Sequence, residues 1–353
     1  MTPAELRERV RREGLLGREG PVVAMVSGGR DSVCLLDVAV AVRDAESVKG
    51  LHVNYGLRGA DSDADERLCV ELGARLGVEL EVVRAEPGKR ERGNLQAWAR
   101  ELRYGAARRL ADELEGRSAG RPATVRSRAL VATGHTASDQ LETILYRLAA
   151  SPGRRALLGM APREGRIVRP LLGVTREQTA AYCRARGLSW REDESNDDER
   201  YARARVRRGL VPALRAVHPA AQESVLRTSE QLREESELLG ELVERELAGR
   251  DSIAVERLAE LHPALARLVV VRLAEDVAGD YVPQAGRRVG EILALAADRR
   301  SAGGGRAEVH VGGSVGAVIE GGELRMVKLP ARPPADGSRG DGRGGGRGEG
   351  RAD

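Results

Sequence analysis

A glycine-rich segment directly after an apolar run has the residue types best suited to phosphate chemistry. Residues 22–26 are apolar and predict a buried strand, and the sequence Ser-Gly-Gly-Arg-Asp-Ser follows it. The two glycines let the backbone approach a ligand closely, and the serine hydroxyls can donate hydrogen bonds. A helix that begins here would point its free N–H groups at the same place. The segment therefore predicts a phosphate loop, made of Ser27, Gly28, Gly29, Arg30, Asp31 and Ser32.

Asp31 is the residue of this loop that would repel a bare phosphate. A carboxylate among phosphate-binding groups is explained by a bound Mg²⁺, which prefers oxygen ligands, or by a catalytic role. We therefore assign Asp31 both as a catalytic residue and as the metal ligand. The alternative is an ordinary glycine turn between strand and helix, in which Asp31 only caps the helix.

A second group of polar residues follows another apolar run, 129–133. His135, Asp139 and Glu142 are spaced i, i+4 and i+7, which puts them on one face of a helix. Carboxylates suit the recognition of ammonium groups, and a histidine suits phosphate or proton handling. Each residue also has a structural alternative, since a lone histidine is often a core residue and Asp139 could cap its own helix.

The segment 200–215 has six arginines and no acidic residue, although the 58 basic and 54 acidic residues of the chain nearly balance. Guanidinium groups fork onto phosphates and hold nucleic-acid backbone by releasing counterions. The alternative is a solvated face in a protein that uses arginine almost everywhere in place of lysine. The arginines of this basic segment are Arg200, Arg203, Arg205, Arg207, Arg208 and Arg215.

Short apolar runs and amphipathic stretches alternate around these groups up to about residue 150. Strands that alternate with helices predict an α/β fold, a doubly wound parallel sheet with helices on both faces. The predicted strands are 22–26, 48–53, 79–83 and 129–133, and the predicted helices are 31–43, 61–76, 94–114 and 139–149. We also expect an edge strand within 167–172 that ends at Pro170, and a helix over 175–186.

The pattern becomes purely helical after about residue 218, with predicted helices over 222–247, 263–278 and 286–297. Three short alternating runs within 307–327, separated by Gly-Gly pairs, predict a small β meander. The last residues are rich in Gly and Arg and predict disorder. The expected domains are a catalytic domain over 1–216, a small helical domain over 217–300, a β meander over 301–330 and a disordered tail over 331–353.

Composition excludes several classes of protein. A net charge of +4 is too small for a bulk polycation, so any nucleic-acid surface must be local. Cys34, Cys69 and Cys183 are far apart and form no Cys-x-x-Cys, which argues against a zinc or iron–sulfur site. We find no apolar run long enough for a membrane span and no signal peptide, and we expect a cytoplasmic protein without membrane contact.

The phosphate loop resembles the pyrophosphate loop of the N-type ATP pyrophosphatases. Those enzymes cleave ATP between the α and β phosphates, and the resemblance implies a sheet like that of the adenine nucleotide α-hydrolases. Further segments, taken together and in order, resemble the tRNA(Ile)-lysidine synthetase family from about residue 20 to about residue 215. These segments are Leu51–Arg58, Asn94–Tyr104, Ala132–Thr143, Arg169–Leu172 and Trp190–Asn196.

The resemblance implies a tRNA-modifying ligase that uses ATP and Mg²⁺. Its substrates would be an isoleucine tRNA with a CAU anticodon and free L-lysine. The wobble cytidine would be adenylated on O2, and the ε-amine of lysine would then attack C2. The products would be lysidine, AMP and pyrophosphate.

The resemblance also implies roles for individual residues. Arg203 and Arg207 match the two arginines of the family pattern Arg-Asn-x-Ile-Arg, in which Ala204 here replaces the asparagine. The assignments are Asp31, His135, Arg203 and Arg207 as catalytic, His52 with the phosphate loop as nucleotide-binding, Asp139 and Glu142 as lysine-binding, and Arg200, Arg205 and Arg208 as tRNA-binding.

Three other functions share parts of the pattern. A cytidine 2-thiolation enzyme of the same superfamily would want a cysteine pair, which this sequence lacks. A small-molecule amidating ligase such as an NAD synthetase would not need the basic segment. A non-catalytic RNA-binding module would not need an intact phosphate loop. The oligomeric state is left open, with a homodimer as one option.

Overall fold

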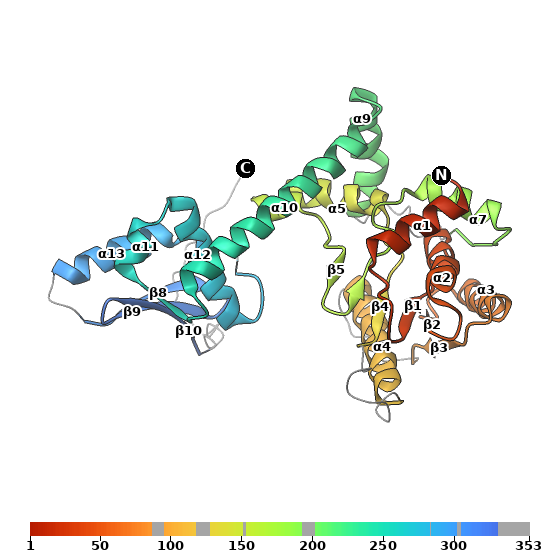
Figure 1. The fold of residues 1–353 in the computed structure, drawn as a ribbon, viewed down its shortest axis with the longest axis horizontal. Coiled ribbons are helices and arrows are strands. Elements are labelled where there is room, and N and C mark those ends of the chain that lie inside the picture. Colours follow the sequence, from red (N-terminus) through yellow and green to blue (C-terminus); the bar gives the residue numbers. More distant parts are fainter. Residues whose placement is uncertain are drawn as a thin grey trace, which may run out of the picture. The chain divides into compact units, whose positions relative to one another are not determined.

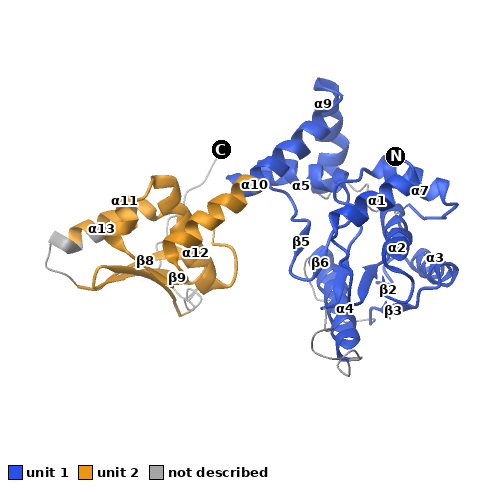
Figure 2. Cartoon of the chain, in the orientation of Figure 1, with its two compact units in different colours: residues 1–233 blue, residues 234–353 orange. Residues whose placement is uncertain are grey.

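The computed structural model divides the chain into two compact units, Met1–Arg233 and Glu234–Asp353 (Figure 2). The boundary between them lies within one long helix, α10 (Ala221–Leu247). The described residues are 1–86, 95–117, 128–150, 153–192, 202–282, 284–301 and 305–330. The predicted tail over 331–353, Arg200 and the end of the Trp190–Asn196 segment lie outside them.

The first unit is built on a mainly parallel sheet with the strand order β3-β2-β1-β4-β6-β5 (Figure 1). Its central strand β1 runs parallel to both neighbours, so that Val22 lies opposite Val48 on one side and Leu130 on the other. The carboxyl ends of these strands therefore meet at one edge of the sheet. The strands are β1 (Val22–Met25), β2 (Val48–Asn54), β3 (Leu80–Arg84), β4 (Leu130–Ala132), β5 (Arg163–Glu164) and β6 (Ile167–Val168).

The strand expected at the edge over 167–172 is wrong in length and in place. Strand β6 ends at Val168 and lies between β4 and the antiparallel β5, which occupies the edge. The chain turns just after it, where Leu172 N–H bonds to Arg169 C=O at 3.1 Å. Because Pro170 has no N–H to offer a neighbouring strand, the ladder cannot continue through it.

Helices cover both faces of the sheet, as the alternating pattern predicts. Alternate residues of β1 enter different cores: Val22 and Ala24 pack on the side of α1, α2, α3 and α7, whereas Val23 and Met25 pack on the side of α4. The predicted helices are confirmed to within a few residues. The helices are α1 (Pro3–Glu13), α2 (Arg30–Arg43), α3 (Ala60–Leu76), α4 (Leu95–Arg117), α5 (Ala137–Ala150), α6 (Arg154–Leu157), α7 (Arg176–Ala185), α8 (Ala202–Arg205) and α9 (Val211–Val217), with a π turn (Val206–Leu210) before α9.

A buried carboxylate joins three of these helices. Asp37 of α2 is 1% exposed and accepts hydrogen bonds from Arg7 of α1 at 2.9 Å and from Tyr182 of α7 at 2.5 Å. Arg186, just after α7, adds a bond at 3.1 Å. Burial acts to raise the pKa of Asp37, but the hydrogen bonds from Arg186, Tyr182 and Arg7 outweigh it and the pKa is lowered. This ionised carboxylate therefore holds α1 and α7 against α2.

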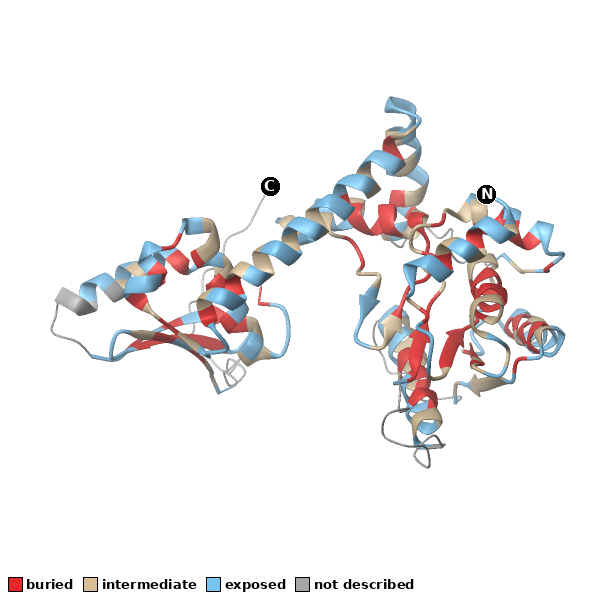
Figure 3. Cartoon of the chain, viewed as in Figure 1, coloured by how far each residue is buried: buried red, intermediate tan, exposed pale blue. Residues whose placement is uncertain are grey.

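The second unit combines helices with an antiparallel sheet of order β7-β10-β9-β8. Its helices and strands share one hydrophobic core, whose buried residues are drawn in red (Figure 3). The predicted meander is confirmed, but β7 was not predicted, because three residues are too few to show a pattern. The elements are β7 (Ser252–Ala254), α11 (Val255–Glu260), α12 (Pro263–Ala278), a 3₁₀ turn (Ala285–Arg287), α13 (Val289–Ser301), β8 (Ala307–Gly312), β9 (Val315–Glu320) and β10 (Glu323–Lys328).

The cysteines lie in the core of the first unit. Cys34, Cys69 and Cys183 are all buried, and burial raises the pKa of the Cys69 thiol to about 12. It therefore remains a thiol at neutral pH. In the part of the chain that is described, no helix combines the length and the apolar character needed to cross a membrane.

We predict that Asp37→Asn destabilises the first unit by about 3 kcal/mol, because the three donors around this buried position lose their charged partner. Urea unfolding followed by tryptophan fluorescence measures this, since Trp98 and Trp190 are the only tryptophans of the chain and both belong to this unit. Glu13→Gln is the matched control, because the Arg9–Glu13 pair is exposed and should contribute less than about 1 kcal/mol.

The Asp37 cluster also predicts how the stability of the first unit changes at acid pH. Because the folded pKa of Asp37 is lowered, its contribution to stability is complete above the unfolded pKa, about 4, and is lost as the pH falls through the folded value. The difference between wild type and Asp37→Asn should therefore shrink below about pH 4. A difference that is constant down to pH 2 would contradict this explanation.

Candidate active site

The phosphate loop connects the end of β1 to the start of α2, as predicted. Gly28 has a φ of 86°, a conformation that favours glycine. The Ser32 hydroxyl closes the loop, because it accepts from Ser27 N–H at 3.0 Å and donates to Gly29 C=O at 2.8 Å. Gly29 caps α2 without a side chain that could accept from the first N–H groups of the helix. These N–H groups can therefore bind an anion.

A close backbone contact brings the loop after β4 against this helix start. A Cβ atom on Gly134 would lie 3.1 Å from the carbonyl carbon and oxygen of Asp31. Those are backbone atoms, which cannot move aside as a flexible side chain would. Gly134 therefore sets how near His135 and the first turn of α5 lie to the phosphate loop.

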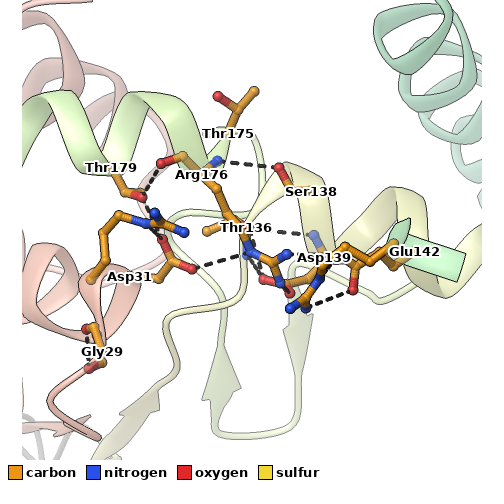
Figure 4. Close-up of polar contacts among 12 residues, drawn as sticks. Gly29, Asp31, Thr136, Ser138, Asp139, Glu142, Thr175, Arg176 and Thr179 are labelled. Atoms are coloured by element: carbon orange, nitrogen blue, oxygen red, sulfur yellow. Dashed lines mark hydrogen bonds and ion pairs between the residues drawn. The ribbon is translucent and has the colours of Figure 1, made fainter. Parts of the chain in front are cut away.

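Asp31, in the first turn of α2, is partly buried and faces α7. Its Oδ1 accepts a hydrogen bond from Thr179 Oγ1 at 2.5 Å, and Arg30 Nε lies 3.5 Å from the same oxygen. Arg176 Nε lies 3.7 Å from Oδ2 (Figure 4). Burial raises the pKa of Asp31 and the nearby charge of Asp139 adds to this, against the hydrogen bond from Thr179 and the two arginines.

Asp139 has two structural roles at once. Its Oδ2 accepts from Thr136 N–H and from Thr136 Oγ1, both at 2.8 Å, which caps the start of α5. Its Oδ1 accepts from Arg176 Nη2 (Figure 4). Burial acts to raise the pKa of Asp139, but Arg176 and the Thr136 bonds outweigh it, so the pKa is lowered and the group is ionised. Asp139 therefore both caps α5 and binds Arg176.

Arg176 joins the acidic residues that the sequence singled out separately. Besides Asp31 and Asp139, its guanidinium contacts Glu142 Oε1 through Nη1 at 2.8 Å. From the sequence we assigned Arg176 no role. A signal was present, because Arg176 begins the predicted helix after Thr175, where the helix dipole disfavours a cation unless acids are near. Thr179, which donates to Asp31, was missed for lack of any signal.

The two arginines that match the family pattern differ in their surroundings. Arg207 lies in the π turn and forks onto Glu142, with Nε 2.8 Å from Oε1 and Nη2 3.1 Å from Oε2. Arg203 lies in α8 and is exposed. Arg205 and Arg208 are exposed as well.

The two candidate histidines are both neutral. His135 Nδ1 lies 2.7 Å from Thr133 Oγ1, and burial lowers its pKa to about 4, with nearby arginines such as Arg203 adding to the effect. His52 is buried, and its Nδ1 lies 2.9 Å from Val26 C=O, to which it must donate because a carbonyl only accepts. Burial lowers the pKa of His52. His52 thus braces the residue just before the phosphate loop.

A parallel sheet that ends in this phosphate loop, with ionisable groups gathered at the same edge, defines an ATP-using domain of the PP-loop class. The model of the PP-loop domain family matches residues 10–214. The chain belongs to the tRNA(Ile)-lysidine synthase family within that class.

Two relatives support this membership, one that the match covers almost in full and one that it covers by half. The tRNA(Ile)-lysidine synthase of Salinispora tropica is 34% identical over 321 residues, which cover 87% of this chain and 91% of that protein. The one of Symbiobacterium thermophilum is 38% identical over 254 residues, which cover 69% of this chain and 50% of that protein. The chain thus spans about half the length of several curated relatives that it matches.

Solved structures share the fold at low sequence identity. The U34-tRNA thiolase NcsA from Methanococcus maripaludis superposes with a TM-score of 0.52 at 16% identity, over 65% of this chain and 79% of that one. This likeness concerns the fold alone.

We predict that Gly134→Ala weakens ATP binding about tenfold or more. The added methyl meets the backbone of Asp31, and overpacking of this kind costs about 1–3 kcal/mol. Titration of a fluorescent ATP analogue measures the change. Gly116→Ala in α4 is the control, since its added methyl meets no atom within 4 Å among the described residues, apart from the adjoining backbone of its own helix. Equal affinities of the two variants would show that the close contact does not position the loop.

Proposed function

We propose that the chain is an ATP-dependent ligase that converts the wobble cytidine of a CAU-anticodon tRNA(Ile) into lysidine. One observation carries the proposal: the phosphate loop and the carboxylates of Asp139 and Glu142 meet at one edge of the sheet, joined through Arg176. A nucleotide and an ammonium substrate can therefore react with the same base. A cytoplasmic location, where tRNA, ATP and lysine occur together, belongs to the proposal.

The first step is adenylation. ATP lies with its phosphates on the Ser27–Ser32 loop, O2 of the cytidine attacks the α-phosphorus, and pyrophosphate leaves. The loop N–H groups and the Ser27 hydroxyl stabilise charge on the phosphates. The new phosphate ester makes O2 part of a good leaving group and C2 more electrophilic.

The donor set fits a Mg²⁺ ion that binds with ATP. Asp31 offers carboxylate oxygen at the phosphate loop, and no cluster of three acidic, His or Cys ligands occurs among the described residues. Mg²⁺ commonly takes one or two carboxylates and completes its shell with phosphates and water. Asp31 would hold the ion, which would offset negative charge on the phosphates.

The second step is the attack of lysine. Asp139 and Glu142 bind its ammonium groups, the ε-ammonium loses a proton, the amine forms a bond to C2, and the C2–O2 bond breaks to release AMP. His135 has a pKa of about 4 and does not hold a proton at neutral pH. We assign it hydrogen bonding to phosphate or brief transfer of the proton.

The basic segment provides contacts to tRNA. Arg205 and Arg208 are exposed, as an electrostatic contact to the phosphate backbone requires. Arg200 belongs to the same proposed surface by sequence. Arg203 and Arg207 are proposed to act on the adenylated cytidine. The oligomeric state, with a homodimer as one option, stays open.

The alternative functions have less support. A thiolation enzyme needs reactive sulfur. The hydrogen bond with Cys183, together with burial, raises the pKa of Cys34, and burial raises the pKa of Cys69. A non-catalytic RNA-binding module would not require an intact phosphate loop. Both alternatives predict that no lysine is transferred to tRNA.

Incubation of the chain with a CAU-anticodon tRNA(Ile) transcript, Mg-ATP and labelled lysine tests the proposal. We expect labelled lysidine on nucleoside analysis, and one AMP for each lysine joined. Asp31→Asn should fold normally and lose more than nine-tenths of the rate, about 1.4 kcal/mol of barrier. AMP release without labelled nucleoside in the wild type would reject lysine as the nucleophile.

The basic segment gives a separate prediction. We expect Arg207→Ala, or Arg203→Ala, to lower the single-turnover rate at saturating tRNA about a hundredfold, since a charge on the adenylated cytidine loses its partner. Arg207, which contacts Glu142, is the stronger candidate.

A segment that only neutralises phosphates would behave differently. Each Ala variant would weaken tRNA binding, lower the slope of log K against log salt by about 0.9 per duplex contact, and leave the saturated rate unchanged. Saturated rates within about threefold of wild type for both variants would reject the catalytic role. Arg208→Ala, also exposed and in the same segment, is the comparison for binding alone.

A further inference from the structure

Arg176 occupies a position that a helix alone would not favour. It is the first residue of α7, where the helix dipole repels a cation, and its side chain is only 18% exposed. Burial alone would lower the pKa of such a group, but Asp139, Glu142 and Asp31 outweigh that and raise it. The guanidinium is therefore kept charged by carboxylates from two other helices, α2 and α5.

The hydrogen bonds of the α5 carboxylates are nearly complete. Each carboxylate has about four lone-pair sites. Within the described part of the chain, Asp139 accepts two bonds from Thr136 and one from Arg176. Glu142 likewise accepts one bond from Arg176 and two from Arg207. About one acceptor site therefore remains on each carboxylate.

Two carboxylates that are held by Arg176 suit the binding of one ammonium group better than the same two carboxylates would without this arginine. Without Arg176, the partly buried Asp139 and the buried Glu142 would repel each other with Arg207 on Glu142 as the remaining cation, and the Asp139 side chain could rotate away or take up a proton. With Arg176, both are fixed on one rigid fork, and their remaining acceptors are held in place. An ammonium has three donors and can use one acceptor from each carboxylate.

We propose that Arg176 is a positioning residue of the reaction: it fixes Asp139 and Glu142 for the incoming lysine ammonium and ties them to the Asp31 end of the phosphate loop. The inference rests on the proposed function. Arg176 acts on lysine through the two carboxylates. Its contact with Asp31 is the longest of the three, at 3.7 Å, and Asp31 keeps its bond to Thr179 without it. Loss of Arg176 should therefore affect the lysine step more than adenylation.

The test compares two arginines of similar setting. Arg176→Met removes the fork, and Arg186→Met removes an arginine that follows the same helix and pairs with another aspartate of α2, Asp37. We expect the KM for lysine to rise at least tenfold in Arg176→Met, while adenylation of tRNA measured without lysine stays within threefold of wild type. In Arg186→Met the stability should fall and the KM for lysine should stay unchanged.

The outcomes separate this inference from the proposed function. No lysidine from the wild type would reject the function itself. A wild type that makes lysidine, together with an unchanged KM for lysine in Arg176→Met, would overturn the positioning role. The positioning role would also be overturned if Arg176→Met slowed adenylation and lysine transfer equally and Arg186→Met did the same. That result would indicate only that both variants damage helix α7.

A conservative variant decides the matter if Arg176→Met does not fold. Lysine at position 176 keeps the charge but offers one ammonium where the guanidinium forks onto two carboxylates. Arg176→Lys should therefore fold, retain more activity than the Met variant, and still show a KM for lysine raised at least threefold. A KM equal to that of the wild type would overturn the proposal.

Discussion

The guanidinium of Arg176 allows three carboxylates to lie close together at one edge of the sheet. Asp31, Asp139 and Glu142 come from two helices, and each would lose stability if left buried beside the others without a cation. The start of α5 depends most on this balance of charge, because Asp139 and Glu142 both bind Arg176, whereas Asp31 also accepts a bond from Thr179. The site is therefore held together by electrostatics across α2, α5 and α7.

The parallel sheet brings these helices to the same place. Strands β1 and β4 are neighbours, so the loops that leave their carboxyl ends must meet, and Gly134 permits them to meet at backbone distance. Below the site, Asp37 fixes α1 and α7 on α2 through a second buried charge cluster. Helix α7 is therefore held near both of its ends. Arg176 and Thr179 near its start contact Asp31 of the phosphate loop. Tyr182 near its end, and Arg186 just after it, bind Asp37.

Sequence patterns predicted the parts of the structure that depend on local periodicity. The central strands, the helices around them and the phosphate loop follow from apolar spacing and glycines, and so does the position of Asp139 and Glu142 on one helix. Strands β5, β6 and β7 were missed or misplaced because two or three residues show no period. The π turn at Val206–Leu210 was not predicted, because no residue pattern in this segment marks it. Arg176 and Thr179 were missed because their partners are distant in the sequence.

We propose that the nucleotide end and the carboxylate end of the site act in turn on one cytidine. The most direct measurement uses a CAU-anticodon tRNA(Ile) whose wobble cytidine carries ¹⁸O at O2, reacted with unlabelled ATP and lysine. If O2 is adenylated and then displaced by lysine, the AMP released carries the heavy oxygen. Heavy oxygen that stays in the tRNA, or AMP with only its original oxygens, would contradict the account.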